Sequence, residues 1–146
     1  MKKRRKVCIA GLGRLGTALL DAGWFEDSEF ELAAGFDINA DRTEALRTLG
    51  LRTKGGQSVP LYPVYKMRDV IYRFGIEIAL LCVPPQAAQE TAEKLAAAGI
   101  KGILNFCPAP VKVPPGTPAG DVNVRNVSLI DELRALDIRE NVNAGL

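Results

Sequence analysis

The chain alternates between short runs of apolar residues and longer segments in which apolar residues recur at helical spacing. Near-continuous apolar runs are typical of strands that are covered on both faces of a parallel sheet. We predict such strands at residues 6–10, 30–37, 76–83 and 101–106, and a strand of alternating pattern at residues 121–127.

Helical spacing fills the intervals between these runs. Asn39 and Gly50 are suitable residues to begin and end one of the helices, and Ser128 is a suitable N-cap for the last one. The helices are predicted at residues 15–22, 40–49, 67–74, 85–98 and 128–136.

Prolines mark the two segments that fit neither pattern. Residues 55–63 read as a loop followed by a short third strand, and Pro60 and Pro63 favour an edge position for that strand. Five of the nine prolines lie between residues 108 and 118, which we therefore predict to be an ordered, extended loop.

The regular alternation of strands and helices predicts an α/β fold, a doubly wound parallel sheet with strand order 3-2-1-4-5-6. A length of 146 residues suits a single domain of the Rossmann, or NAD(P)-binding, type. We place this domain at residues 7–136, between a basic N-terminal tail (1–6) and a polar C-terminal tail (137–146).

Charge narrows the choice of partners. Residues 2–6 carry five of the 19 basic residues, so the remaining 14, against 17 acidic residues, give the rest of the chain a net charge of −3. Proteins that bind duplex DNA spread basic charge over a folded face, so we expect no specific DNA binding by this chain. No apolar run is long enough for a signal peptide or a membrane span, and we expect a cytoplasmic protein.

Candidate catalytic and metal-binding residues are few. The chain has no histidine, which excludes Ser-His and Cys-His catalysis. Its cysteines, Cys8, Cys82 and Cys107, form no C-x-x-C pair and indicate no metal site. Cys82 and Cys107 are predicted at similar heights on neighbouring strands, so a redox pair is one interpretation, although buried thiols more often act as small apolar groups.

The strongest motif is G-x-G-x-x-G between the first strand and the first helix. Gly11 permits the tight turn, Gly13 lets a pyrophosphate approach the backbone, and Gly16 allows close packing of helix on strand. Asp37 follows Gly16 by 21 residues, the offset expected for an acid that binds a ribose 2′-hydroxyl, which favours NAD over NADP. Arg14 either reaches the pyrophosphate or is a surface residue.

Apolar residues complete the predicted cofactor-binding site. Leu15 belongs to the glycine motif, Val83 and Pro84 lie where the fourth strand ends, and Phe106 and Pro108 lie where the fifth strand ends. Ligands of this architecture bind at the carboxyl ends of the strands, so we expect these side chains to wall the nicotinamide side. Ordinary core packing is the alternative interpretation.

Five segments together resemble one family, the redox-sensing transcriptional repressor Rex. They are GLGRLGTALL (11–20), FELAAGFDINADR (30–42), IEIALLCVPPQAAQETAEKL (76–95), AGIKGILNFCPAPVKVPPG (98–116) and VRNVSLIDELRAL (124–136). The resemblance is to the C-terminal domain, a CoA-binding-type Rossmann domain that binds NADH or NAD. It implies a homodimer that exchanges its C-terminal helix, with the pyrophosphate on the three glycines, the adenosine ribose on Asp37 and the nicotinamide half at Val83, Pro84 and Phe106.

Three departures from the family limit this inference. Only six residues precede the predicted domain, so the winged-helix domain that binds the operator has no counterpart in this sequence, and we expect either a free-standing sensor domain or a fragment. Arg14 stands where the family often has asparagine. The tail DIRENVNAGL is polar where the family tends to be aromatic, which weakens the case for an exchanged helix.

The resulting hypothesis is an NAD(H)-binding, redox-sensing regulatory domain without catalytic residues, which acts as a homodimer and has a Rex-like regulator as a further candidate partner. A small NAD-dependent oxidoreductase, or the cofactor domain of one, is an alternative; its general acid would be Lys101, Lys112 or a tyrosine. Binding of CoA or another adenine nucleotide is a third possibility.

Overall fold

The computed structural model describes residues 4–39, 50–118 and 120–139. The helix predicted at residues 40–49 lies outside these described residues. Among the helices of the described part, none is long and apolar enough to cross a membrane.

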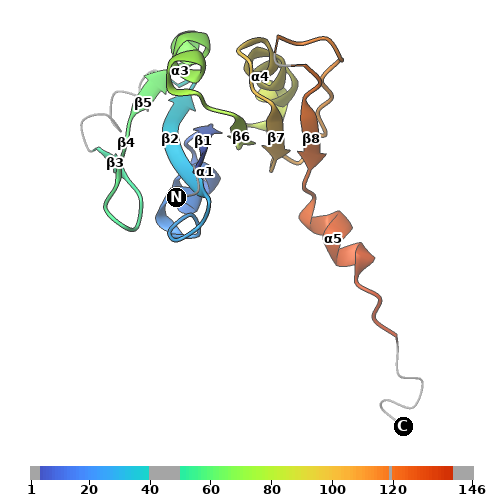
Figure 1. Ribbon diagram of the computed structural model, residues 1–146. Helices are drawn as coiled ribbons and strands as arrows, with labels where there is room; N and C mark the ends of the chain where they lie inside the picture. The colour runs from blue at the N-terminus through green and yellow to red at the C-terminus, as the bar shows by residue number, and fades with distance from the viewer. Residues whose placement is uncertain (1–3, 40–49, 119, 140–146) are drawn as a thin grey trace.

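A six-stranded sheet, parallel at every pairing, forms the centre of the molecule (Figure 1). Its order is β5-β2-β1-β6-β7-β8, which confirms the predicted order 3-2-1-4-5-6 and the edge position of the third strand. The strands are β1 (Arg5–Ala10), β2 (Phe30–Asp37), β5 (Leu61–Pro63), β6 (Ile78–Leu81), β7 (Gly102–Asn105) and β8 (Asn123–Asn126).

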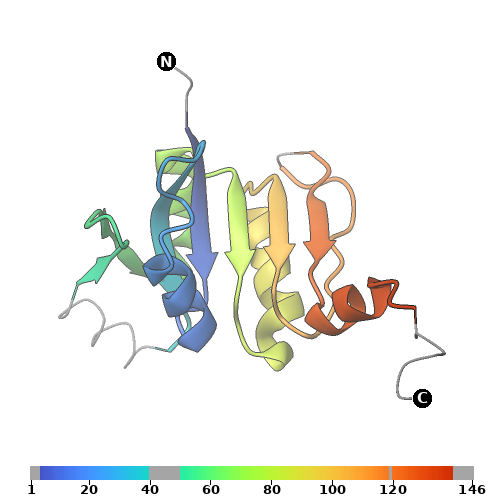
Figure 2. The same cartoon turned by 90° about the horizontal axis from the view of Figure 1, so that it is seen from below.

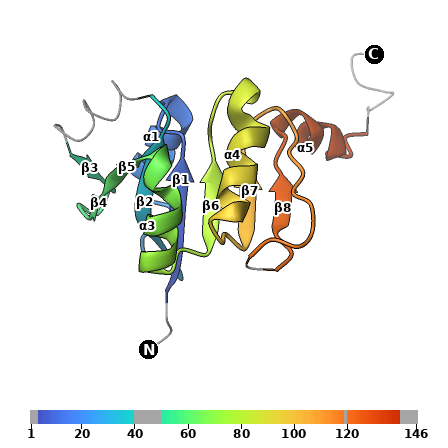
Figure 3. The ribbon, with the colours of Figure 1, turned by 90° about the horizontal axis from the view of Figure 1, so that it is seen from above.

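Helices lie on both faces of this sheet. α1 (Arg14–Asp21) covers one face (Figure 2), and α3 (Met67–Phe74) and α4 (Pro85–Ala97) cover the other (Figure 3). The sheet therefore separates two apolar clusters, one built on α1 and one on α3 and α4. Alternate residues of β1 divide between them, because successive side chains of a strand point to opposite faces.

The chain between β2 and β5 holds an element that the sequence did not indicate. β3 (Leu51–Arg52) and β4 (Ser58–Val59) form a small antiparallel hairpin outside the main sheet, part of which was predicted to be loop. Two-residue strands are too short for any periodicity to be read from the sequence. A 3-10 turn, η1 (Val64–Lys66), then leads into α3.

The last helix, α5 (Leu129–Ala135), extends away from the sheet beyond β8 (Figure 1). Ser128 caps it as predicted: its Oγ accepts a hydrogen bond of 3.2 Å from the Asp131 amide. None of its residues is buried, so no part of the described chain covers its apolar side chains.

Candidate functional site

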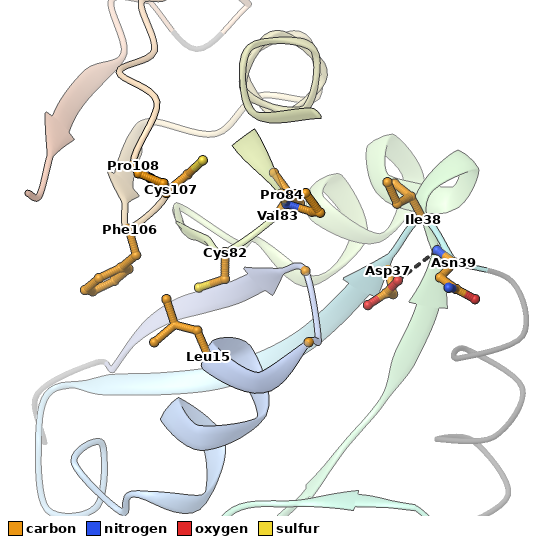
Figure 4. A pocket seen from close by; sticks show the side chains of 12 residues that line it. Leu15, Asp37, Ile38, Asn39, Cys82, Val83, Pro84, Phe106, Cys107 and Pro108 are labelled. Carbon is orange, nitrogen blue, oxygen red and sulfur yellow. Dashed lines mark hydrogen bonds between the residues drawn. The ribbon is translucent and has the colours of Figure 1, made fainter. Parts of the chain in front are cut away.

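A cavity of about 420 Å³ opens at the carboxyl ends of the central strands (Figure 4). Its walls come from the ends of β1, β2, β6 and β7 and from the start of α1, the place where parallel α/β sheets bind ligands. The described residues that line it are Gly11, Gly13, Leu15, Asp37, Ile38, Asn39, Cys82, Val83, Pro84, Phe106, Cys107 and Pro108.

Gly11 directs the chain from β1 into the glycine loop. Its φ of +100° is a conformation that residues with a side chain rarely adopt. A Cβ at this position would lie 2.6 Å from the Cys82 carbonyl oxygen. The backbones at the ends of β1 and β6 therefore approach each other too closely for a side chain at position 11.

Gly16 allows the first turn of α1 to rest on the glycine loop. A Cβ there would lie 2.0 Å from the carbonyl oxygen of Gly11, far inside van der Waals contact. Gly13, the residue before the helix, has no side chain with which to cap the first-turn amides. The positive end of the α1 dipole is therefore presented beside the cavity, the arrangement that favours an anionic ligand.

Asp37 both lines the cavity and supports its glycine loop. Its side chain is buried (4% exposed), and its two carboxylate oxygens accept 2.8 Å hydrogen bonds from the backbone amides of Leu12 and Asn39. The sequence suggested only a ligand-binding role for this residue. Its second role follows from position, because the end of β2 lies beside the end of β1, where the loop begins.

The apolar residues predicted to wall the cavity do line it, and we call them the apolar wall. Val83 and Pro84 follow β6, while Phe106 and Pro108 follow β7, and all four line the cavity. Val83 and Phe106 also pack in the two apolar clusters, on opposite faces of the sheet. The two interpretations of these residues, cavity wall and core packing, therefore both apply.

Cys82 and Cys107 line the cavity from different directions. Cys82 packs in the cluster on the α1 face, Cys107 packs in the other, and their sulfurs point different ways in Figure 4. The sheet register explains this: Leu81 pairs with Asn105, so Cys82 is level with Phe106 rather than with Cys107. Burial, with a smaller contribution from Cys107, raises the pKa of Cys82 to about 12, so its sulfur stays a neutral thiol. The arrangement agrees with small apolar thiols rather than a redox pair.

Two of the ten predicted site residues do not line the cavity. Gly16 is a buried residue of α1, and Arg14 is exposed at the first turn of the same helix. Ile38 and Asn39 do line it, although the sequence did not lead us to predict either of them as a site residue. Their position directly after the second strand was the available signal, since every strand of the sheet ends at this edge.

The lysines considered as general acids lie away from the cavity. Lys101 precedes β7 at the opposite edge of the sheet and forms an ion pair of 3.7 Å with Glu77. Lys112 is exposed on the β7–β8 connection, and none of the three tyrosines is among the described lining residues. Within the described residues no cluster of His, Cys, Asp or Glu suits a metal ion.

Comparison with known proteins finds repressors that match most of this chain. The redox-sensing transcriptional repressor Rex of Oenococcus oeni is 34% identical over 134 residues, which cover 92% of this chain and 57% of that protein. The crystal structure of RSP, a Rex-family repressor, in complex with beta-NADH superposes with a TM-score of 0.73 and 39% identity, covering 90% of this chain and 57% of that one. The chain thus spans slightly more than half the length of these relatives.

More distant similarity concerns the fold alone. An aldose-aldose oxidoreductase from Caulobacter crescentus superposes with a TM-score of 0.53 at 17% identity, over 70% of this chain and 29% of that one.

A family model described as CoA binding domain matches residues 2–109, which include most strands of the described sheet. Sequence, fold and cavity therefore agree that this chain belongs to the CoA binding domain family, as a Rex-like Rossmann domain.

Proposed function

We propose that this chain binds NADH or NAD in the cavity at the carboxyl ends of its strands and acts as a nucleotide-responsive regulatory domain. The observation that carries the proposal is the meeting of three features in one cavity: the glycine loop, the buried Asp37 and the apolar wall after β6 and β7. These match the pyrophosphate, a ribose and the nicotinamide of a dinucleotide. The complex of RSP with beta-NADH gives further support.

The pyrophosphate is assigned to the start of α1. First-turn amides and the helix dipole attract an anion there. Arg14 occupies this turn as an exposed cation, which is unfavourable beside the positive end of a dipole unless an anion binds close by. We therefore keep Arg14 as a phosphate contact, together with the backbone at Gly11, Gly13 and Leu15.

Asp37 is assigned to the adenosine ribose. A carboxylate can accept more than one hydrogen bond on each oxygen, so binding of the Leu12 and Asn39 amides does not by itself prevent Asp37 from accepting a bond from a ligand hydroxyl. The same negative charge repels the 2′-phosphate of NADPH. The proposal therefore includes a preference for NADH and NAD over their phosphorylated forms.

We propose no catalytic step at this site. Among the described lining residues the side chains that could exchange a proton are Asp37, Cys82 and Cys107. Burial raises the pKa of the Cys82 thiol to about 12, far from the range that suits acid–base catalysis near neutral pH, and Asp37 is engaged by two backbone amides. The relatives that match over most of this chain are named as repressors, which also favours a regulatory role.

Calorimetric titration with NADH, NAD, NADPH and CoA tests the proposal. We expect NADH or NAD to bind most tightly, and NADPH and CoA to bind at least tenfold more weakly, because both carry an additional ribose phosphate. Tightest binding of CoA would replace the proposal with the CoA alternative that the family description raises. Turnover of a small alcohol or carbonyl substrate with NAD(H) would instead favour the oxidoreductase alternative.

The regulatory unit that we propose is a homodimer joined through α5. Leu129 and Leu133 lie one turn apart on this helix and are 73% and 52% exposed. A seven-residue helix gains too little from its own hydrogen bonds to be stable in water without packing. A second copy of the chain would supply the packing.

Sedimentation analysis of two variants tests the dimer. Leu133→Lys places a charge on the apolar side of α5 and is expected to give monomers. Ala135→Lys adds the same charge on the opposite side, because successive helical residues are about 100° apart, and is expected to leave the dimer intact. A monomeric parent chain, or equal effects of the two variants, would refute this part of the proposal.

A further inference from the structure

The connection from β7 to β8 carries one wall of the cavity but lacks backbone hydrogen bonds of its own. Within the described residues, no backbone group of residues 107–112 bonds to another backbone group. Pro108 and Pro110 have no amide hydrogen, so this stretch cannot form a regular ladder. Yet Cys107 and Pro108 must keep a fixed position to shape the cavity.

Two asparagine side chains hold residues 107–111 of this stretch in place, and we call them the amide clasp; the backbone of Lys112 is held separately, by the side chain of Gln89. Asn105 Nδ2 donates to the Ala109 carbonyl (2.8 Å) and to Asn126 Oδ1 (2.9 Å), and Asn105 Oδ1 accepts from the Cys107 amide (2.9 Å). Asn126 Oδ1 also accepts from the Val111 amide (3.0 Å), and Asn126 Nδ2 donates to the Val111 carbonyl (3.3 Å).

Burial of the Asn105 amide removes its hydrogen bonds to water, and the free energy lost is regained only through the bonds of the clasp. Its side chain is fully buried (0% exposed) at the end of β7, where an apolar residue would continue the core. A buried amide is tolerated when its donors and acceptor are paired, and both Nδ2 hydrogens and Oδ1 are paired here. The clasp also joins β7 to β8, because Asn105 and Asn126 are register partners.

Neither asparagine lines the cavity, but the residues that they fix do. Phe106 directly follows Asn105 in the chain, and the backbone amide of Cys107 donates a hydrogen bond to the side chain of Asn105. These residues form the side of the cavity away from Asp37, the side that would receive the nicotinamide. The adenosine side is built on β1 and β2 instead, without support from the clasp.

We infer that Asn105 and Asn126 are positioning residues that set the affinity of this domain for the nicotinamide half of its ligand and not for the adenosine half. The inference rests on the proposed function. Loss of the clasp would free the 106–111 stretch to take other conformations, and binding of the nicotinamide would then have to order it again.

The test compares two ligands on matched variants. ADP-ribose shares the adenosine, pyrophosphate and second ribose of NADH and lacks only the nicotinamide ring. Asn126→Ala removes the exposed member of the clasp, and Asn123→Ala makes the same change on the same strand at a side chain without hydrogen bonds in the described structure. Calorimetry gives both dissociation constants for each protein.

We expect Asn126→Ala to weaken NADH binding by about tenfold, the scale of one or two lost hydrogen bonds, and to change ADP-ribose binding by less than twofold. Asn123→Ala should change neither. Asn126→Asp keeps the acceptor for Val111 and Asn105 but loses the donor, and is expected to weaken NADH alone, by about threefold. It provides the same comparison if the alanine variant does not fold.

The outcomes separate the two proposals. If the parent protein binds neither ligand, the proposed function fails. If the parent binds both, and the variants at Asn126 either retain full NADH affinity or lose both ligands equally, the positioning role is refuted while the proposed function stands.

Discussion

Replacement of Asp37 by asparagine removes one charge and one acceptor at the centre of the site. The hydrogen bonds of Asp37 indicate how much stability the protein without ligand would lose. The Leu12 and Asn39 amides each donate to a different oxygen of Asp37 at 2.8 Å, and an asparagine can accept only one of them through oxygen. One hydrogen bond to a charged group is worth about 1.5–3 kcal/mol. We expect a loss of about 2 kcal/mol in the free energy of unfolding, or about 4–8 °C in Tm.

The same variant also tests ligand selectivity independently of stability. Two unit charges about 4 Å apart repel by about 4 kcal/mol at an effective dielectric constant of 20. Removal of the Asp37 charge should therefore bring the affinities for NADPH and NADH at least tenfold closer together. The ratio of the two affinities is the quantity to measure, because both ligands bind the same folded protein and any loss of folded fraction cancels.

Urea denaturation and calorimetric titration of the parent and Asp37→Asn proteins provide the measurements. Unchanged stability would show that the two backbone contacts do not brace the glycine loop. An unchanged NADPH to NADH ratio would show that Asp37 does not face the ribose 2′-position. The two parts of the reasoning can fail separately, since one concerns backbone amides and the other the ligand.

Two further predictions concern packing and burial. Gly16→Ala should lower the free energy of unfolding by about 3 kcal/mol in urea titration, because its Cβ would overlap the Gly11 carbonyl; Gly102→Ala, where the nearest atom is 3.8 Å away, is the control and should cost much less. Burial raises the pKa of Cys8 from 9.0 to about 12, so the folded state keeps a proton that the unfolded state loses above pH 9. Stability is therefore constant below pH 9 and falls above it by about 1.4 kcal/mol per pH unit for this thiol. Cys8→Ala should show a shallower fall, and an identical slope would contradict the assigned burial.

Much of the fold was predictable because it depends on local pattern. Apolar runs gave the positions of the main strands, and α3 has the predicted bounds because Gly75 ends its amphipathic pattern. Strand ends were less well predicted: β6 is the four-residue segment Ile78–Leu81, not the whole apolar run 76–83. An apolar run records burial, whereas a strand ends where its neighbours stop pairing, and β1 pairs with only those four residues.

The candidate site likewise has features that the sequence predicts and features that depend on tertiary contacts. The sequence by itself determined the glycine loop, Asp37 and the apolar wall, because residue type and spacing along one chain already carry that chemistry. Only the tertiary structure decided that Asp37 also braces the loop, that Cys82 and Cys107 belong to opposite faces, and that Asn105 meets Asn126. These facts depend on register between strands distant in sequence, and register is set by how all the side chains pack at once rather than by any local pattern.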